Sequence, residues 1–156
     1  MLRRDFASAA AAMLLLFSSS GGAAEDLGYD PKAEPFEQLA QGVARAKADD
    51  KLVLLISGGD WCIWCHYLNA FIKSNADVSE QLYDTFVVVK VYVGGDNKNE
   101  EFFSSWPEAE GAPHFWVFSA DGNLLRSQGT LALEDGGKSY DKEAFLGFIG
   151  RWKNRG

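Results

Sequence analysis

The sequence predicts a single α/β domain, and three features of its 156 residues indicate this fold class. Two almost continuous apolar runs, at 51–56 and 86–93, are typical of strands that are covered on both faces of a sheet. Helical periodicity lies between the two runs, which favours a parallel pair of strands joined by a crossover. Near the C-terminus, Asp121-Gly122 lies between two short apolar segments and predicts an antiparallel hairpin.

The first elements follow from the order of polar and apolar residues. Residues 25–34 are mostly polar and are expected to form a loose lead-in. Behind Pro35, apolar residues recur at i, i+3, i+4 and i+7, so a helix is expected up to about Asp49. The strand at 51–56 then ends at Ser57-Gly58-Gly59, where the glycines favour a turn.

The middle of the chain alternates helix and strand. A helical stripe of apolar residues continues from Tyr67 to about Ser74, and a second short helix is expected at 78–83. Residues 86–93 are rich in β-branched side chains and give the strongest strand pattern in the chain. The acidic segment 94–111 is expected to be a solvated loop with a helical turn or two, and it is a candidate for partner choice.

The last third of the domain is predicted to be a hairpin followed by a helix. Residues 115–118 and 124–125 form the two arms around the turn. A final stripe of apolar residues, from Phe145 to Trp152, predicts an amphipathic helix, and Asp141 is placed to cap its start.

The first 24 residues have the layout of a cleaved export signal. A basic start precedes an apolar stretch at 7–17, and small residues lead to Ala24. The apolar stretch is too short for a membrane span. Because Arg3-Arg4-Asp5-Phe6 resembles part of a twin-arginine signal, both this route and general secretion stay open. Cleavage would leave one domain, 25–156, which is expected to work in a bacterial periplasm.

The charge of the chain excludes some classes of partner. It carries 22 acidic and 15 basic residues, for a net charge of −7. An acidic domain gains no affinity for nucleic acid from counterion release. No second long apolar segment follows the leader, so membrane insertion after signal cleavage is not expected.

The only two cysteines lie together in the stretch Gly59–His66, which reads GDWCIWCH. A buried strand ends just before them and a helical stripe follows, so Cys62 is expected at or near a helix N-terminus. Unpaired backbone N–H groups and the helix dipole favour a thiolate there, and in such motifs the thiol pKa falls to roughly 3.5–7.5. Cys65 lies one helical turn later, within bridging reach. An exposed nucleophilic thiol with a second thiol behind it is the arrangement that disulfide exchange needs.

Three motifs together resemble the thioredoxin-fold superfamily. They are DWCIWC after the first strand, GAPHFWVF after the second strand region, and SADGNLL. The chain is similar, more narrowly, to exported (periplasmic) thioredoxin-like proteins of the DWCxxC type, over about residues 36–152. The resemblance implies a central mixed β-sheet flanked by helices, with the redox CxxC pair at a helix N-terminus.

The resemblance also implies roles for residues outside the cysteine pair. Pro113 is expected to be cis and to face the cysteines, and the backbone of Ala112 is expected to pair with an extended substrate segment. Thioredoxins carry a buried acid six residues before the first cysteine, where this chain has Ile56. Either Asp60 or water then handles the proton of Cys65, or the site is tuned differently.

Three further side chains are expected near the pair. Trp61 is expected to shape the rim of the docking surface. Trp64 is either an exposed platform for partner peptides or the first residue of the core stripe. His114 is a candidate to stabilise the Cys62 thiolate if Pro113 turns it inward, and Asp60 is a second candidate for thiolate tuning.

These features lead to one preferred function. We expect a periplasmic thiol–disulfide oxidoreductase in which Cys62 is the nucleophile and Cys65 the resolving thiol. Its substrates are expected to be protein thiols and disulfides, with no bound cofactor. The resemblance favours a reductase, which by analogy would receive electrons from a membrane donor.

Three other interpretations use the same cysteines. Cys62 to His66 also fits the c-type haem motif CxxCH, but the domain at 25–156 has no methionine to serve as a sixth ligand. Zinc bound by Cys62, Cys65, His66 and His114 has suitable ligand types but is weakly signalled, and no metal is expected. A non-catalytic thioredoxin-like binding module would carry the pair as a structural disulfide.

Overall fold

The computed structural model describes residues 25–153 and residue 155, so the predicted export signal lies outside the described residues. A mixed sheet of four strands, in the order β2-β1-β3-β4, forms the centre of the domain. The strands are β1 (Leu52–Gly58), β2 (Phe86–Tyr92), β3 (His114–Phe118) and β4 (Leu124–Gly129). β2 pairs in parallel with β1, whereas β1 with β3 and β3 with β4 are antiparallel. The expected α/β fold with a mixed sheet is confirmed.

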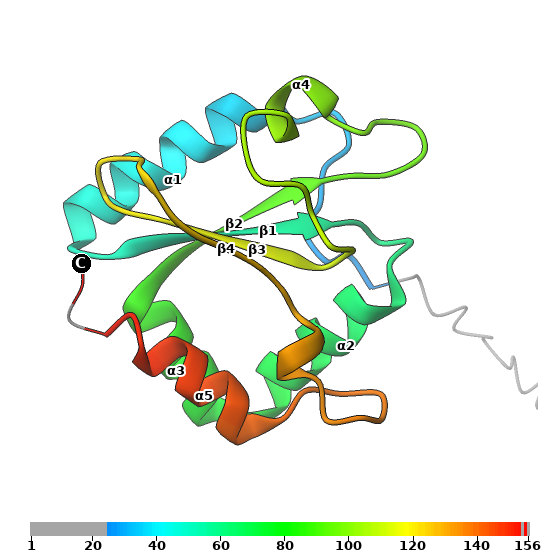
Figure 1. Cartoon of the computed structure of the whole chain (residues 1–156), viewed down its shortest axis with the longest axis vertical. Coiled ribbons are helices and arrows are strands. Elements are labelled where there is room, and N and C mark those ends of the chain that lie inside the picture. The colour runs from blue at the N-terminus through cyan, green and yellow to red at the C-terminus, as the bar shows by residue number, and fades with distance from the viewer. Residues whose placement is uncertain (1–24, 154, 156) are drawn as a thin grey trace, which may run out of the picture.

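Helices cover both faces of the sheet (Figure 1). α1 and α4 lie on one face, and α2, α3 and α5 lie on the other. The helical elements are α1 (Pro35–Asp49), α2 (Ile63–Ser74), α3 (Ala76–Thr85), α4 (Glu100–Phe103), the short 3₁₀ helix η1 (Leu131–Leu133) and α5 (Lys142–Gly150). Within the described residues, no helix is long and apolar enough to cross a membrane.

Local signals explain where the first helix begins and ends. Pro35 lies in the first turn, and the Glu34 side chain accepts a hydrogen bond from the Glu37 N–H. Asp50 ends the helix in the left-handed conformation. Gly42 allows α1 to approach the sheet closely, because a Cβ atom there would lie 2.4 Å from a methyl group of Val89. Helix α1 therefore packs directly on the Val89 side chain of β2, with no side chain of its own at this point.

β1 is the central strand, and all seven of its residues are buried. Its side chains alternate between two hydrophobic cores, as a strand covered on both faces requires. Leu54 and Ile56 face the core on the side of α2, α3 and α5. Val53 and Leu55 face the core on the side of α1 and α4. The strand therefore holds its C-terminal end, where the cysteines follow, between two packed layers.

The lead-in segment is the main departure from the expected fold. The prediction of a loose segment at 25–34 is wrong, because Leu27 and Tyr29 are 2% and 8% exposed and pack beside the cysteines. β4 is also longer than the expected arm at 124–125 and extends to Gly129.

Candidate active site

Cys62 lies at the start of α2, directly after the turn that follows β1. It is the N-cap residue, and its Sγ accepts a hydrogen bond of 3.2 Å from the Cys65 N–H. Cys65 lies one turn into the helix and is disulfide-bonded to Cys62, with 5.2 Å between the two Cα atoms. A sulfur in this position faces the unpaired N–H groups and the positive end of the helix dipole. The predicted position of the pair at a helix N-terminus is confirmed.

Both cysteines are more buried than the sequence suggests. Each is 3% exposed in the disulfide form, so the expectation of an exposed Cys62 is wrong for this state. They belong to a small hydrophobic cluster with Leu27 and Tyr29, against which Ala112 and other side chains also pack. The burial follows from the lead-in segment, which contributes two of the four fully buried side chains of the cluster.

Ala112 and Pro113 lie beside the nucleophile. The peptide bond between them is cis, as the resemblance implied. The Ala112 carbonyl oxygen lies 3.4 Å from Cys62 Sγ. In the disulfide this is a contact without a proton, but a Cys62 thiol would have an acceptor there. The backbone expected to dock an extended segment is therefore next to the sulfur that would react.

The two tryptophans near the cysteines have different environments. The Trp61 indole donates a hydrogen bond of 2.7 Å to the Val93 carbonyl oxygen, yet the residue is 60% exposed. Trp64 is partly buried and packs edge-on against Tyr67 and Tyr140, at ring-centroid distances of 5.2 and 5.8 Å. The Trp61 side chain is thus largely exposed to solvent, whereas Trp64 belongs to the apolar stripe of α2 that packs into the core.

Ile63 is the exposed side chain between the cysteines, at 57% exposure. CxxC spacing alone does not show which of the two intervening residues faces solvent, so it does not identify Ile63. The apolar stripe of the helix does distinguish the two residues. Trp64 lies three and four residues before Tyr67 and Leu68, a spacing that places it on the buried face.

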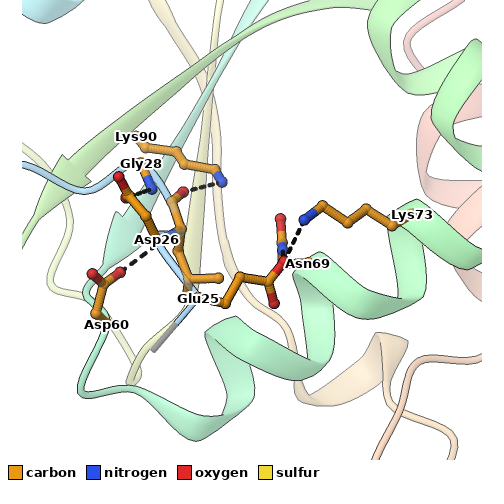
Figure 2. A network of polar contacts seen from close by, with 8 residues as sticks. Glu25, Asp26, Gly28, Asp60, Asn69, Lys73 and Lys90 are labelled. Atoms are coloured by element: carbon orange, nitrogen blue, oxygen red, sulfur yellow. Dashed lines mark hydrogen bonds and ion pairs between the residues drawn. The ribbon is translucent and has the colours of Figure 1, made fainter. Parts of the chain in front are cut away.

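A network of polar contacts fixes the lead-in segment beside the cysteines (Figure 2). The Leu27 N–H donates to the Asp60 carboxylate at 3.2 Å, and the Lys90 ammonium donates to the Leu27 carbonyl oxygen. At the start of the segment, the Glu25 carboxylate accepts hydrogen bonds from Lys73 and, at 3.1 Å, from Asn69. The hydrogen bond and charge of Lys73 hold the pKa of Glu25 below its ordinary value.

The Asp60 carboxylate therefore supports the lead-in segment. Its described hydrogen bond goes to Leu27, and its backbone carbonyl accepts one of 2.7 Å from His66 Nε2. Its expected role in tuning the thiolate or moving the Cys65 proton gains no hydrogen bond to either sulfur among the described residues.

Both ring nitrogens of His114 have partners other than Cys62, so its expected role in stabilising the thiolate gains no hydrogen bond to the sulfur among the described residues. His114 is 1% exposed, and its Nδ1 accepts a 3.1 Å hydrogen bond from the Glu110 N–H. Its Nε2 lies 2.8 Å from the Ser127 hydroxyl and its ring packs on Trp116 at 4.3 Å. Because Nδ1 is an acceptor, a neutral ring carries its proton on Nε2 and donates it to Ser127. These contacts hold His114, the first residue of β3, in place directly after Pro113.

The buried histidine predicts a dependence of stability on pH. Burial lowers the pKa of His114 below 6.5, and the charge of Glu110 opposes this only in part. Below pH 6.5 the unfolded chain takes up this proton before the folded chain does, so stability is lost as the pH falls towards the folded pKa. Denaturant unfolding between pH 7 and 5 should show a loss of at most about 1.4 kcal/mol per pH unit from this group. His114→Gln should show a flatter profile, and equal slopes would contradict the prediction.

A small cavity lies behind Cys65. Its volume is about 20 Å³, and its lining includes the hydroxyl-bearing Tyr29 and the polar Asn69 and Lys90. Ile56 lies in the same lining, where thioredoxins carry their buried acid. Burial lowers the pKa of Lys90, with the charge of Lys73 acting in the same direction, and burial raises the pKa of Tyr29. This volume exceeds the roughly 10–15 Å³ that one water molecule requires.

The four side chains considered for zinc do not form a common site. In residues 25–153 and 155, no group of three or more His, Cys, Asp or Glu side chains is arranged to hold a metal ion. His66 donates to a backbone carbonyl, and the ring of His114 contacts Glu110 and Ser127. The site consists instead of the Cys62–Cys65 disulfide, the cis Ala112-Pro113 bond beside it and an apolar surround.

Comparison with known proteins agrees with this geometry. Residues 39–136 match the thioredoxin-like domain family, and the chain belongs to this family. A search of curated proteins gives no match.

Solved structures also resemble the chain, among them a disulphide isomerase and a domain of DsbD. The disulphide isomerase from Xylella fastidiosa Temecula1 is 25% identical, with a TM-score of 0.69 over 81% of this chain and 96% of that one. The C-terminal domain of Neisseria meningitidis DsbD in its oxidised form is 18% identical, with a TM-score of 0.56 over 78% of this chain and 97% of that one. The second likeness shows the fold alone.

Proposed function

We propose that the protein is a periplasmic thiol–disulfide oxidoreductase that exchanges disulfides with partner proteins through Cys62 and Cys65. One observation carries the proposal. The Cys62 sulfur is the N-cap of α2, accepts the Cys65 N–H and lies 3.4 Å from the Ala112 carbonyl oxygen. A thiolate there is stabilised by the helix and adjoins an edge that can hold a substrate backbone.

The exchange proceeds in two balanced steps. The Cys62 thiolate attacks one sulfur of the partner's disulfide, which forms a mixed disulfide and releases the other partner sulfur as a thiolate. Cys65 then loses its proton and attacks Cys62 Sγ, which releases the second partner thiolate. The partner is reduced by two electrons, and the Cys62–Cys65 pair is oxidised. The reverse sequence oxidises a partner dithiol.

The cavity beside Cys65 offers a route for the proton of the second step. A water molecule of the size that this cavity admits would lie among Tyr29, Asn69 and Lys90. The Asp60 carboxylate is directed to the Leu27 N–H, which favours water over Asp60 as the acceptor. Such a water molecule would take the place of the buried carboxylate that thioredoxins carry at the position of Ile56.

Export and the direction of electron flow complete the proposal. The leader pattern in the first 24 residues supports a periplasmic location, by general secretion or the twin-arginine route. The resemblance to DWCxxC proteins favours a reductase that draws electrons from a membrane donor.

A binding module with a static disulfide is the second candidate, and the burial of the cysteines favours it. Each cysteine is 3% exposed, and buried bridges resist exchange. Equilibration with glutathione buffers separates the two functions. A catalytic pair exchanges rapidly, whereas a structural bridge stays oxidised and has a potential below about −300 mV.

Trapping of mixed disulfides tests the oxidoreductase directly. Cys65→Ala keeps the nucleophile but removes the resolving thiol, so it should accumulate covalent adducts at Cys62 that dithiothreitol releases. Cys62→Ala is the matched control and should capture few or none. Mass spectrometry of the released proteins identifies the substrates. The proposal fails if neither variant captures a partner and the wild-type protein is also inert towards a model peptide disulfide.

A further inference from the structure

A groove of about 670 Å³ lies beside the cysteine pair, on the side of segment 94–111. We call it the Trp61–Trp106 groove. Its lining includes Trp61 and Ala112 next to the active site, Phe103 and Trp106 from α4 and the residues after it, and Ser57 and Trp116 on the sheet. Ala112 both lines the groove and contacts Cys62 Sγ, so an occupant would lie within a few residues of a cysteine bound at Cys62.

The walls of the groove are held in place before any ligand binds. Trp61 is fixed by its hydrogen bond to Val93, and its indole lies so close to Gly59 that a Cβ atom there would be 2.5 Å from Nε1. In the same lining, Trp106 packs edge-on against Phe118 at 5.0 Å, and Phe103 packs on Trp116 at 5.4 Å. Preformed apolar walls of this kind suit a large apolar side chain.

Two polar groups of the lining have no partner among the described residues. Ser57 Oγ and Trp106 Nε1 are both buried without a hydrogen bond, and Ser57 is 1% exposed. An unsatisfied buried polar group is unfavourable. Both atoms are covered by neighbouring atoms, so an occupant of the groove in this conformation would not reach them.

The rim of the groove has an acidic bias. Segment 94–111 carries five acidic side chains and one basic one: Asp96, Glu100, Glu101, Glu108, Glu110 and Lys98. Of these, Glu100, Glu108 and Lys98 line the groove itself, and Lys98 pairs with Glu100 at 3.8 Å, so Glu108 is the lining carboxylate without an ion pair among the described residues. A partner with positive charge beside its apolar side chain complements this segment.

We propose that the Trp61–Trp106 groove selects substrates, by binding a bulky aromatic side chain that lies near the reacting cysteine and has Lys or Arg beside it. This inference rests on the proposed exchange function and assigns segment 94–111 as the element that reads the substrate. The aromatic side chain packs between the apolar walls, and the basic neighbour lies towards Glu108.

Peptide disulfides test the preference. One series moves a single Phe through the three positions on each side of the cysteine, in an otherwise Ala-Lys background, and kcat/KM is measured for each peptide. The kcat/KM of the best Phe peptide should exceed that of the peptide without Phe by about tenfold or more, as burial of a large apolar side chain implies. Equal rates at every position would overturn the inference.

Ala109→Trp fills the groove and provides the structural control. Ala109 lines the groove and is exposed, so a larger side chain has room to fold over the hollow. The ratio of kcat/KM for the best Phe peptide to kcat/KM for the peptide without Phe should fall to about one in this variant. Ala132→Trp makes the same change at an exposed residue of a different hollow and should keep the ratio. An unchanged ratio in Ala109→Trp would place the Phe elsewhere and overturn the inference.

The charge preference is tested by exchanging Lys for Glu in the best peptide. The Lys peptide should react several-fold faster at low ionic strength, and the advantage should shrink at 1 M salt. Equal rates at low salt would contradict the basic neighbour. Failure of the exchange function looks different, because the wild-type protein would then react with none of the peptides.

Discussion

Gly58→Ala is expected to lower the free energy of unfolding by about 1–3 kcal/mol, the usual cost of overpacking. A methyl group on Gly58 would lie 2.5 Å from Cys65 Sγ and 3.0 Å from the end of the Tyr29 side chain. Neither neighbour has free space, because Cys65 and Tyr29 are 3% and 8% exposed. Urea denaturation of the oxidised protein measures the effect.

Gly147→Ala is the matched control for this substitution. Gly147 lies inside α5, and a Cβ atom there would meet no other atom within 4 Å. The same change should therefore stabilise the protein, by about 0.5–1 kcal/mol, through helix propensity. A stable Gly58→Ala variant would show that the contact between the end of β1, the disulfide and Tyr29 is looser than described.

Leu27→Ala is expected to speed the reduction of the disulfide by small thiols about tenfold. Truncation of a buried leucine removes roughly 2–5 kcal/mol of packing, and about 1.4 kcal/mol applied to local opening already raises the open population tenfold. Leu27 is 2% exposed and packs in the cluster that contains both cysteines. The reduction rate in dithiothreitol and the hydrogen exchange of the Leu27 amide, which donates to Asp60, measure the opening.

Leu131→Ala is the control for this prediction, since Leu131 is 79% exposed and its truncation should change neither quantity. If Leu27→Ala lost amide protection but kept the wild-type reduction rate, the lead-in segment would not limit access to the cysteines. The thiol would then reach the sulfurs from the side of Ala112.

Elements set by local signals could be predicted from the sequence. The strands β1 and β2 appear as apolar runs, and α1 appears as a periodic stripe behind Pro35. The cap of α5 is also local, because the Asp141 carboxylate accepts a hydrogen bond of 2.7 Å from the Ala144 N–H. Each depends on residues within a few positions of one another, where spacing and residue type carry the information.

Features that depend on distant contacts could not be predicted. In the lead-in segment, Leu27 and Tyr29 are the apolar side chains that pack beside the cysteines. Leu27 is held by hydrogen bonds with Asp60 and Lys90, which are 33 and 63 residues away in the sequence. The orientation of His114 depends on which face of β3 it occupies, and one residue of register reverses that face. The groove likewise forms only when segment 94–111 folds back beside Trp61.

The attachment of Cys62 to the end of β1 has a consequence for partial unfolding. β1 is paired on both sides and entirely buried, so its amides should exchange only when the whole domain opens. The edge strand β4 is paired on one side only and can fray in subglobal openings that leave β1 intact. Redox competence should therefore persist through such openings and disappear only in the final cooperative step.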